Sequence, residues 1–120
     1  QWSFLMTGDI DQASEIALIR SNLVNHYTFL KLGHHGSRLS NSMAFLQTVQ
    51  PHFVWNSSGR YNLYGHPHTT VLSRLDDLDI PYLSTHQYGA IIFDFNSNVT
   101  IYSQLGFKKY VLENNGYKLR

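Results

Sequence analysis

The sequence predicts a single α/β domain in which helices pack on a mixed β-sheet. Apolar runs of strand length alternate with segments of helical periodicity in the order β-α-β-α-β-α-β-β-β, a pattern typical of layered α/β proteins. The 120 residues suffice for one small domain with a core, but not for two independent ones. Hydrophobic residues make up 42% of the chain and charged residues 14%, which is a globular composition and not that of a disordered tail.

Three βα units are expected in the first two thirds of the chain. Asp11 is placed to cap a helix over residues 12–20, whose apolar stripe would consist of Ala13, Ile16, Ala17 and Ile19. Ser40 or Asn41 can cap a second helix that a proline follows, and a third helix is predicted over residues 69–78. The strands that alternate with these helices are predicted at residues 2–6, 27–32, 52–58 and 80–85.

A β-hairpin and a tail are expected at the end of the chain. Strands are predicted over residues 89–95 and 99–105, and Asn96-Ser97-Asn98 has the composition of a hairpin turn between them. From residue 106 onward the polarity is mixed and predicts no particular element. The expected organisation is therefore one domain over residues 1–105, followed by a tail over residues 106–120.

The composition excludes some kinds of site and leaves others open. The chain has no cysteine, so it can form neither a disulfide framework nor a thiolate zinc site. A formal net charge of +1 is too small to indicate nucleic-acid binding from charge alone. No apolar stretch is long enough to cross a bilayer, and the chain opens on a strand-like segment, QWSFLM, and lacks an initiator Met. We therefore expect a fragment of a longer protein.

Three polar clusters follow directly after apolar strands. They are Thr7-Gly8-Asp9, His34-His35-Gly36-Ser37, and Asn56-Ser57-Ser58 with the downstream segment Tyr64-Gly65-His66-Pro67-His68. Loops at the same strand ends of a layered α/β domain gather along one edge, where binding sites are commonly built. Carboxylate oxygen and imidazole nitrogen suit zinc or manganese, and a glycine beside a ligand lets the backbone approach a metal or phosphate closely.

Each cluster taken singly also has an ordinary structural interpretation. Asp9 in a Gly-Asp pair is typical of a turn or a helix cap. Adjacent side chains in an extended segment point in opposite directions, so His34 and His35 would rarely bind one metal together. His66 and His68 around a proline could form a rigid turn with solvent-facing imidazoles. The prediction of a site therefore depends on the combination and order of the clusters.

The order FLMTGD, LKLGHHGSRLS, NLYGHPH and THQYGAIIF resembles one family closely. It is similar to the second half of the metallo-β-lactamase-like domain at the C-terminal end of ComEC, the DNA-internalisation competence protein. The resemblance covers roughly residues 4 to 95. GHHGS also occurs in other metallo-β-lactamase-like hydrolases, whereas GHHGS followed by YGHP and GAI is narrower. The resemblance implies the C-terminal half of an αββα sandwich, so that residues 1–105 would be a partial domain.

The resemblance also implies roles for particular residues. Asp9 matches the aspartate that bridges metal ions in the superfamily, and His34 or His35 matches the late metal-ligand histidine. His34 is preferred by analogy with the glycine-preceded histidine of related hydrolases. Ser37 could hydrogen-bond the site or a phosphate.

A further motif and an absent one complete the expected site. His66, with Asn62 nearby, matches the YGHP loop, for which phosphate contact or proton donation is inferred. The principal metal motif of the superfamily, H-x-H-x-D-H, does not occur in the chain and would belong to a first half that lies before Gln1. A divalent metal, zinc or manganese, is therefore expected only in the intact domain, and the fragment alone is expected to be inactive.

By this resemblance the parent is a metal-dependent phosphodiesterase or nuclease of a DNA-uptake membrane protein, and it degrades the strand that is not transported. Its expected partners are single-stranded DNA, the missing N-terminal half of the domain and the membrane channel domain. The parent would lie in the bacterial inner membrane with this domain on the periplasmic or extracellular side, and the fragment could self-associate. Two alternatives remain open at this stage: a degenerate scaffold without catalysis, and a hydrolase of the same superfamily with another substrate.

Overall fold

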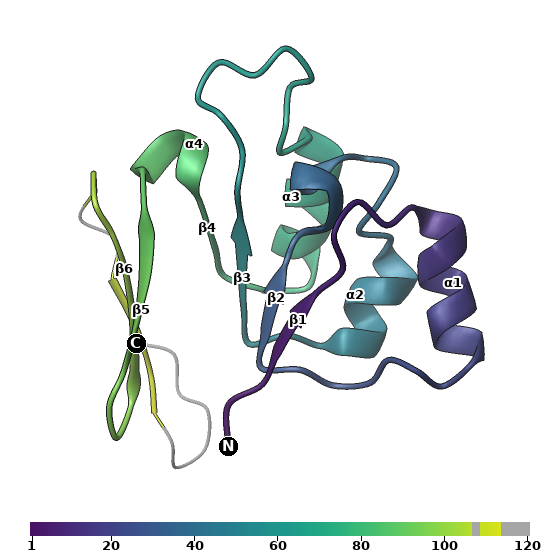
Figure 1. Cartoon of the computed structure of the whole chain (residues 1–120), viewed down its shortest axis with the longest axis horizontal. Helices are drawn as coiled ribbons and strands as arrows, with labels where there is room; N and C mark the ends of the chain where they lie inside the picture. Colours follow the sequence, from purple (N-terminus) through teal and green to yellow (C-terminus); the bar gives the residue numbers. More distant parts are fainter. Residues whose placement is uncertain (107–108, 114–120) are drawn as a thin grey trace.

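The computed structural model describes residues 1–106 and 109–113 of the chain (Figure 1). It confirms the α/β class and shows the strands in two sheets. The first is parallel, in the order β1-β2-β3-β4, with strands Phe4–Met6, Phe29–Lys31, Phe53–Asn56 and Tyr82–Ser84. The second is antiparallel, in the order β5-β6-β7, with strands Ile91–Phe95, Val99–Ser103 and Lys109–Leu112.

Helices make the connections between the parallel strands. Their bounds are Gln12–Arg20 for α1, Met43–Val49 for α2 and Thr69–Asp77 for α3, with a short helix α4 at Thr85–Tyr88 after β4. Parallel neighbours require such crossovers, because each chain segment must return to the end of the sheet from which it started. In the part of the chain that the structure describes, none of the helices combines the length and apolar character needed to cross a membrane.

The two sheets and the helices form three layers, with the parallel sheet in the middle (Figure 1). Successive side chains of a strand point to opposite faces, so Phe29 and Leu30 enter different cores. Leu30 and Val54 pack with residues of α2 and α3, whereas Phe29 and Phe53 pack against Val99, Ile101 and Leu112 of the antiparallel sheet. Burial on both faces explains why these strands are continuous apolar runs in the sequence.

The predicted strands, helices and hairpin are largely confirmed, with the structural strands shorter at their ends. Asp11 caps α1 through a hydrogen bond from the Ser14 N–H at 2.8 Å, as expected. The cap of α2 is Ser42, one or two residues later than predicted. Helix α4 was not predicted: residue 85 was expected to end a strand, and residues 86–88 were assigned to no element. Within the expected tail, Lys109–Leu112 forms β7, and residues 107–108 and 114–120 lie outside the described residues.

The predicted apolar stripe of α1 is wrong at three of its four positions, whereas the fourth, Ile19, packs partly buried against the core. Ala13, Ile16 and Ala17 are exposed, whereas Glu15 is completely buried. Its two carboxylate oxygens accept hydrogen bonds from the backbone N–H groups of Asn41, at 2.6 Å, and Ser42, at 2.9 Å. These donors lie at the N-terminus of α2, where a helix leaves N–H groups without intrahelical partners. The orientation of α1 is therefore set by a polar contact with α2 that helical periodicity does not reveal.

Replacing Glu15 by Ala is expected to lower the free energy of unfolding by about 2 kcal/mol or more, because buried N–H groups lose their acceptor. Glu15→Gln, which keeps one acceptor oxygen, should retain part of this stability. Chemical denaturation measures the effect, and Ile16→Ala on the exposed side of the same helix is the control, with an expected change within about 0.5 kcal/mol. Equal losses for Glu15→Ala and Ile16→Ala would contradict the assignment.

Candidate functional site

The carboxyl ends of β1, β2 and β3 lie along one edge of the parallel sheet, and the three predicted polar clusters gather there (Figure 1). The His34 N–H donates to the Gly8 carbonyl at 2.9 Å, which joins the loop after β1 to the loop after β2. The Ser40 hydroxyl donates to the Ile10 carbonyl and joins the same two loops at a second point. The sequence-based expectation that these loops converge is therefore confirmed.

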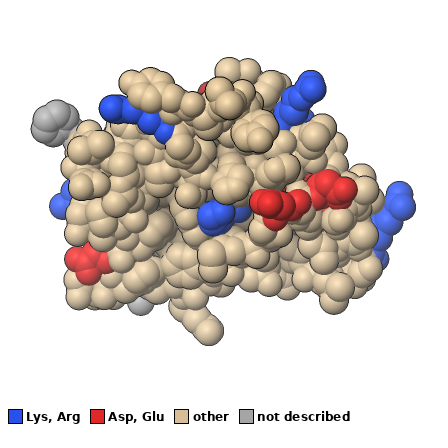
Figure 2. All heavy atoms as spheres, turned by 45° about the horizontal axis from the view of Figure 1, so that its top comes forward, with Lys and Arg blue, Asp and Glu red and all other residues tan. Residues whose placement is uncertain are grey.

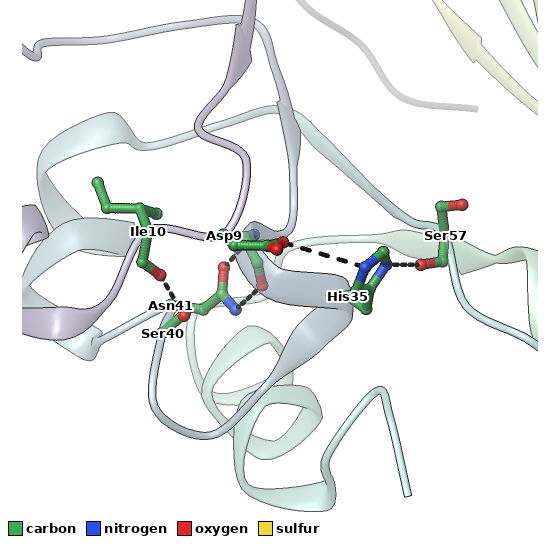
Figure 3. A network of polar contacts seen from close by, with 7 residues as sticks. Asp9, Ile10, His35, Ser40, Asn41 and Ser57 are labelled. Carbon is green, nitrogen blue, oxygen red and sulfur yellow. Dashed lines mark hydrogen bonds and ion pairs between the residues drawn. The ribbon is translucent and has the colours of Figure 1, made fainter. Parts of the chain in front are cut away.

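Asp9 and His35 form the pair at the centre of the edge (Figure 3). Asp9 Oδ1 and His35 Nε2 are 4.0 Å apart, and the two side chains are 71% and 53% exposed. His35 Nδ1 lies 2.8 Å from the carbonyl oxygen of Ser57, in the loop after β3. Because a carbonyl can only accept, Nδ1 carries the proton, and the lone pair of the neutral ring is on Nε2. The ring is thus held in the tautomer in which Nε2, the nitrogen near Asp9, can bind a metal.

The two histidines occupy a turn, Gly33–Gly36, that we call the histidine turn. Both have left-handed backbone conformations, with φ of 48° at His34 and 57° at His35, which is costly for residues other than glycine. The ring centroids are 6.2 Å apart at an interplanar angle of 61°. His35 lies next to Asp9, whereas the His34 ring lies 5.9 Å from that of His66. The segment is not extended, so the alternation assumed from the sequence does not apply to it.

Asn41 holds the histidine turn in place. Its side-chain oxygen accepts from the Gly33 N–H at 2.8 Å, and its side-chain nitrogen donates to the Gly33 carbonyl at 3.0 Å (Figure 3). Asn41 is itself buried and has a φ of 58°. The sequence analysis considered this residue only as a helix cap. The available signal was its type, since asparagine tolerates the left-handed region and its short amide reaches nearby backbone.

Gly36 connects the histidine turn to the YGHP loop. A Cβ atom at Gly36, where φ is +82°, would lie 2.6 Å from Cβ and 2.8 Å from Cα of Pro67. The His68 N–H donates to the Gly36 carbonyl at 2.9 Å, and the His66–Pro67 peptide bond is cis. The glycine is required here both by the backbone conformation and by the close approach of the proline.

Asn62 organises the loop that precedes Pro67. Its side-chain nitrogen donates to the carbonyls of Gly59, at 2.8 Å, and His66, at 2.6 Å. Its side-chain oxygen accepts from the His66 N–H at 2.7 Å. The amide therefore serves the backbone of its own loop. Burial, and to a lesser extent repulsion from His34, His35 and His68, lowers the pKa of His66.

Ser37 and Asn56 are buried beneath the loops of the sheet edge and hydrogen-bond within them. Ser37 is buried, and its hydroxyl oxygen accepts from the Leu39 N–H at 3.2 Å. The Asn56 side-chain nitrogen donates to the hydroxyls of Ser58, at 3.0 Å, and Ser84, at 3.1 Å. The sequence analysis included Asn56 in a polar cluster but gave it no role. It links the loop after β3 to the end of β4.

A pocket of about 310 Å³ opens between these loops, lined by His35, Ser57, Ser58, Gly59, Asn62, Tyr64 and His66. Its volume is at the lower end of the range for ligand pockets, about 300–1,000 Å³. His35 and His66 reach the pocket from the loops after β2 and β3, so a ligand in it would meet both imidazoles. The pocket joins the Asp9–His35 pair to the YGHP loop in one surface.

The residues present have the ligand types that a divalent metal binds, but there are too few of them for a complete site. A carboxylate oxygen and an imidazole nitrogen are suitable zinc or manganese ligands. Two ligand atoms about 2 Å from one tetrahedral ion would be ~3.3 Å apart, so the exposed Asp9 carboxylate would need to turn slightly toward His35. Among residues 1–106 and 109–113, no group of three or more His, Cys, Asp or Glu could hold an ion. The roles of His34, His66, Asn62 and Ser37 remain predictions.

Comparison with known proteins shows similarity to curated competence proteins. The chain is 35% identical to ComE operon protein 3 of Bacillus subtilis (strain 168) over 101 residues, which is 84% of this chain and 13% of that protein. It is 40% identical to Competence protein ComA of Neisseria gonorrhoeae over 92 residues, 76% of this chain and 13% of that protein. It is 38% identical to Recombination protein 2 of Haemophilus influenzae over 73 residues, 61% of this chain and 9% of that protein.

Each match covers a large share of this chain but a small share of the relative. The chain spans 13% or less of the length of these three relatives, although the matches cover most of the chain itself. No family model matches the chain.

Replacing Gly36 by Ala is expected to destabilise the protein more than replacing Gly65 by Ala. Both glycines have positive φ, so each variant should lose about 1–2 kcal/mol from backbone strain alone. Nothing lies within 4 Å of a Cβ at Gly65, whereas at Gly36 the added atom meets Pro67 and should cost about 1–3 kcal/mol more. Chemical denaturation of the two variants measures the difference, and equal losses would show that the contact with Pro67 is unimportant.

The stability of the protein is expected to depend on pH through His86. Burial lowers the pKa of His86, whose Nδ1 lies 2.6 Å from the Ser84 hydroxyl oxygen. Below the ordinary histidine value of about 6.5, the unfolded chain binds a proton more readily than the folded one, so this contribution to stability is lost as the pH falls. His86→Gln should therefore flatten the rise in unfolding free energy between pH 5 and 7.5. An unchanged slope would contradict the prediction, and above pH 7.5 the variant should follow the parent curve at a constant offset.

Proposed function

This chain is a homologue of a segment of the ComEC-family competence proteins, and from that premise we propose that it serves DNA uptake in natural transformation as part of a metal-dependent nuclease. The homologues named ComE operon protein 3, Competence protein ComA and Recombination protein 2 support the role in competence. The substrate under this proposal is DNA, specifically the strand that is not transported. The longer protein would be membrane-associated, with this domain on the periplasmic or extracellular side.

The observation that carries the nuclease proposal is the approach of Asp9 to His35 with the Ser57 carbonyl behind the ring. A hydrogen bond from the far nitrogen of an imidazole to a carbonyl is the usual support of a metal-ligating histidine. We therefore propose Asp9 and His35 as the ligands of a divalent ion, zinc or manganese. Analogy with related hydrolases favoured His34, but the His34 ring lies against His66, in a position better suited to substrate.

Further ligands would come from a part of the longer protein outside this chain. A zinc site normally has three or four protein ligands, and the described residues bring two suitable ones together. Strand β1 is an edge of the parallel sheet, and Met6 on it is 66% exposed. Leu39, whose carbonyl accepts from the Gln12 N–H at the start of α1, is 62% exposed. An unpaired edge with exposed apolar side chains is suited to pairing with further chain. We propose that the N-terminal half of the same domain covers it.

When bound, the metal would lower the pKa of a water molecule and offset negative charge on phosphoryl oxygens. The residues of this chain would position the substrate. His66 lines the same pocket as His35 and can donate a hydrogen bond to a phosphate oxygen, which stabilises charge that develops there. Asn62 would not contact the substrate itself. It would position His66, because its amide hydrogen-bonds the N–H and the carbonyl of that residue.

A second candidate function is a scaffold that handles DNA without cutting it. The observation in its favour is that only two ligands meet in the described part of the chain. Under this alternative, the Asp9–His35 pair would bind metal weakly or not at all in any form of the protein. Measurements of hydrolysis and of metal binding together separate the two functions.

In the longer protein, Asp9→Asn and His35→Gln are each expected to lower hydrolysis of a single-stranded oligodeoxynucleotide by more than about 100-fold. His34→Gln is the matched control for His35→Gln, because it changes the neighbouring imidazole in the same turn and should have a smaller effect. Release of labelled nucleotides measures the rate. Unchanged hydrolysis in Asp9→Asn would reject the nuclease, and a larger effect of His34→Gln would exchange the roles of the two histidines.

Metal titration of the chain itself provides the companion measurement. Saturable NMR shifts of Asp9 and His35 on addition of Zn²⁺ or Mn²⁺, lost in Asp9→Asn, would support the pair as part of a metal site. Metal binding without hydrolysis by the longer protein would favour the scaffold.

A further inference from the structure

A group of large side chains projects into solvent from the loop between β3 and α3, which rises above the sheet edge in Figure 1. Tyr61, Leu63 and Tyr64 are 88%, 99% and 80% exposed. We call residues 60–64 the aromatic loop. Single exposed apolar residues are ordinary on a protein surface, but three within four positions form a patch that indicates a binding surface.

The aromatic loop is held in shape by its one inward-facing amide. Asn62 lies between Tyr61 and Leu63, and its side chain makes three hydrogen bonds, to the Gly59 carbonyl and to the N–H and carbonyl of His66. With Asn62 turned into the loop, its neighbours are directed away from it. The rings are therefore presented by a fixed backbone, so less conformational freedom is lost when a ligand binds them.

The aromatic loop is continuous with the candidate site. Tyr64 lines the same pocket as His35, and its ring stacks beside the His66 ring with centroids 5.7 Å apart and an interplanar angle of 30°. A flat ligand on Tyr64 would lie next to His66 and then His35. We therefore expect one ligand molecule to occupy both places, with one part on the aromatic loop and a neighbouring part in the pocket.

The charge around the loop decides which part of that molecule it contacts. Figure 2 shows this end of the protein as mostly uncharged surface with separate basic and acidic groups, and the formal net charge is +1. Such a surface cannot hold a polyanion through phosphate contacts alone. Exposed aromatic rings instead bind nucleobases by stacking, which tolerates any base sequence, and Arg60 next to them supplies one cation.

We propose that the aromatic loop binds unpaired bases of single-stranded DNA, with Tyr61 and Tyr64 as stacking residues, and so leads the adjoining phosphate toward His66 and His35. The proposal rests on the proposed function for its substrate but concerns binding, not hydrolysis. It gives the site a preference for unpaired strands, because bases paired and stacked within a duplex are not accessible to the rings.

The test measures the binding of fluorescein-labelled single-stranded oligodeoxynucleotides to the full chain by fluorescence anisotropy. EDTA is present throughout, so that neither bound metal nor hydrolysis contributes to the signal. Tyr61→Ala and Tyr64→Ala are each expected to weaken binding about 5-fold or more, and Tyr61→Phe should restore it. Tyr61→Leu, which keeps apolar bulk without a ring, should remain weak. Tyr102→Ala, at a partly exposed tyrosine of β6, is the matched control and should bind like the parent chain. An oligonucleotide with abasic sites should bind the parent as weakly as the normal strand binds the alanine variants.

Several results would overturn the proposal. Equal binding of abasic and normal strands would show phosphate contacts only, and no binding at millimolar strand would show no DNA surface. Loss of self-association or of binding to lipid vesicles in Tyr61→Ala, with DNA binding unchanged, would identify another chain copy or a membrane as the occupant. Tighter binding of RNA than DNA would reject the substrate class. Failure of the proposed nuclease function can be told apart from failure of this proposal. The nuclease is rejected if the Asp9→Asn variant of the longer protein still hydrolyses DNA, whereas the binding measurements described here need no hydrolysis.

Discussion

The arrangement of the sheet edge depends on the buried polar contacts of Asn41. Its side chain binds both backbone groups of Gly33, its N–H donates to Glu15 of α1, and its carbonyl accepts from Arg74 of α3 at 2.8 Å. One residue therefore connects two helices to the turn that carries the histidines. Buried polar groups are costly unless they are fully paired, so this network has one favourable arrangement. That arrangement offsets the strain of two left-handed histidines and places His35 beside Asp9.

The layering of the domain makes this edge possible. The parallel strands are only three or four residues long, and an isolated sheet of that size would be marginal. Here helices cover one face and the antiparallel sheet covers the other, so the inner strands β2 and β3 are buried on both sides, whereas the edge strand β1 is partly exposed. The loops at the carboxyl ends can then hold polar and strained residues, because the apolar layers below supply the stability.

How far the sequence predicts this structure depends on whether the cause is local. The strands and helices follow from apolar runs and caps, and the gathering of the three polar clusters follows from parallel topology. The buried side of α1 could not be predicted, because Glu15 faces inward to satisfy N–H groups more than twenty residues away. Nor could the sequence predict that His35 and not His34 lies beside Asp9, since the turn that directs the two rings depends on Asn41 and on the contact of Gly36 with Pro67. Strand β7 was missed because it depends on pairing with β6 and on the packing of Leu112 between the two sheets, and not on its own polarity pattern.

The contact of Gly36 with Pro67 joins the loops after β2 and β3 into a single body. Neither loop can be displaced without disturbing the other, because backbone and ring atoms meet at this contact and the His68 N–H donates to the Gly36 carbonyl. The backbone segments that carry His35 and His66 therefore keep their spacing across the pocket that both side chains line. A ligand there meets a surface whose geometry is set before it arrives.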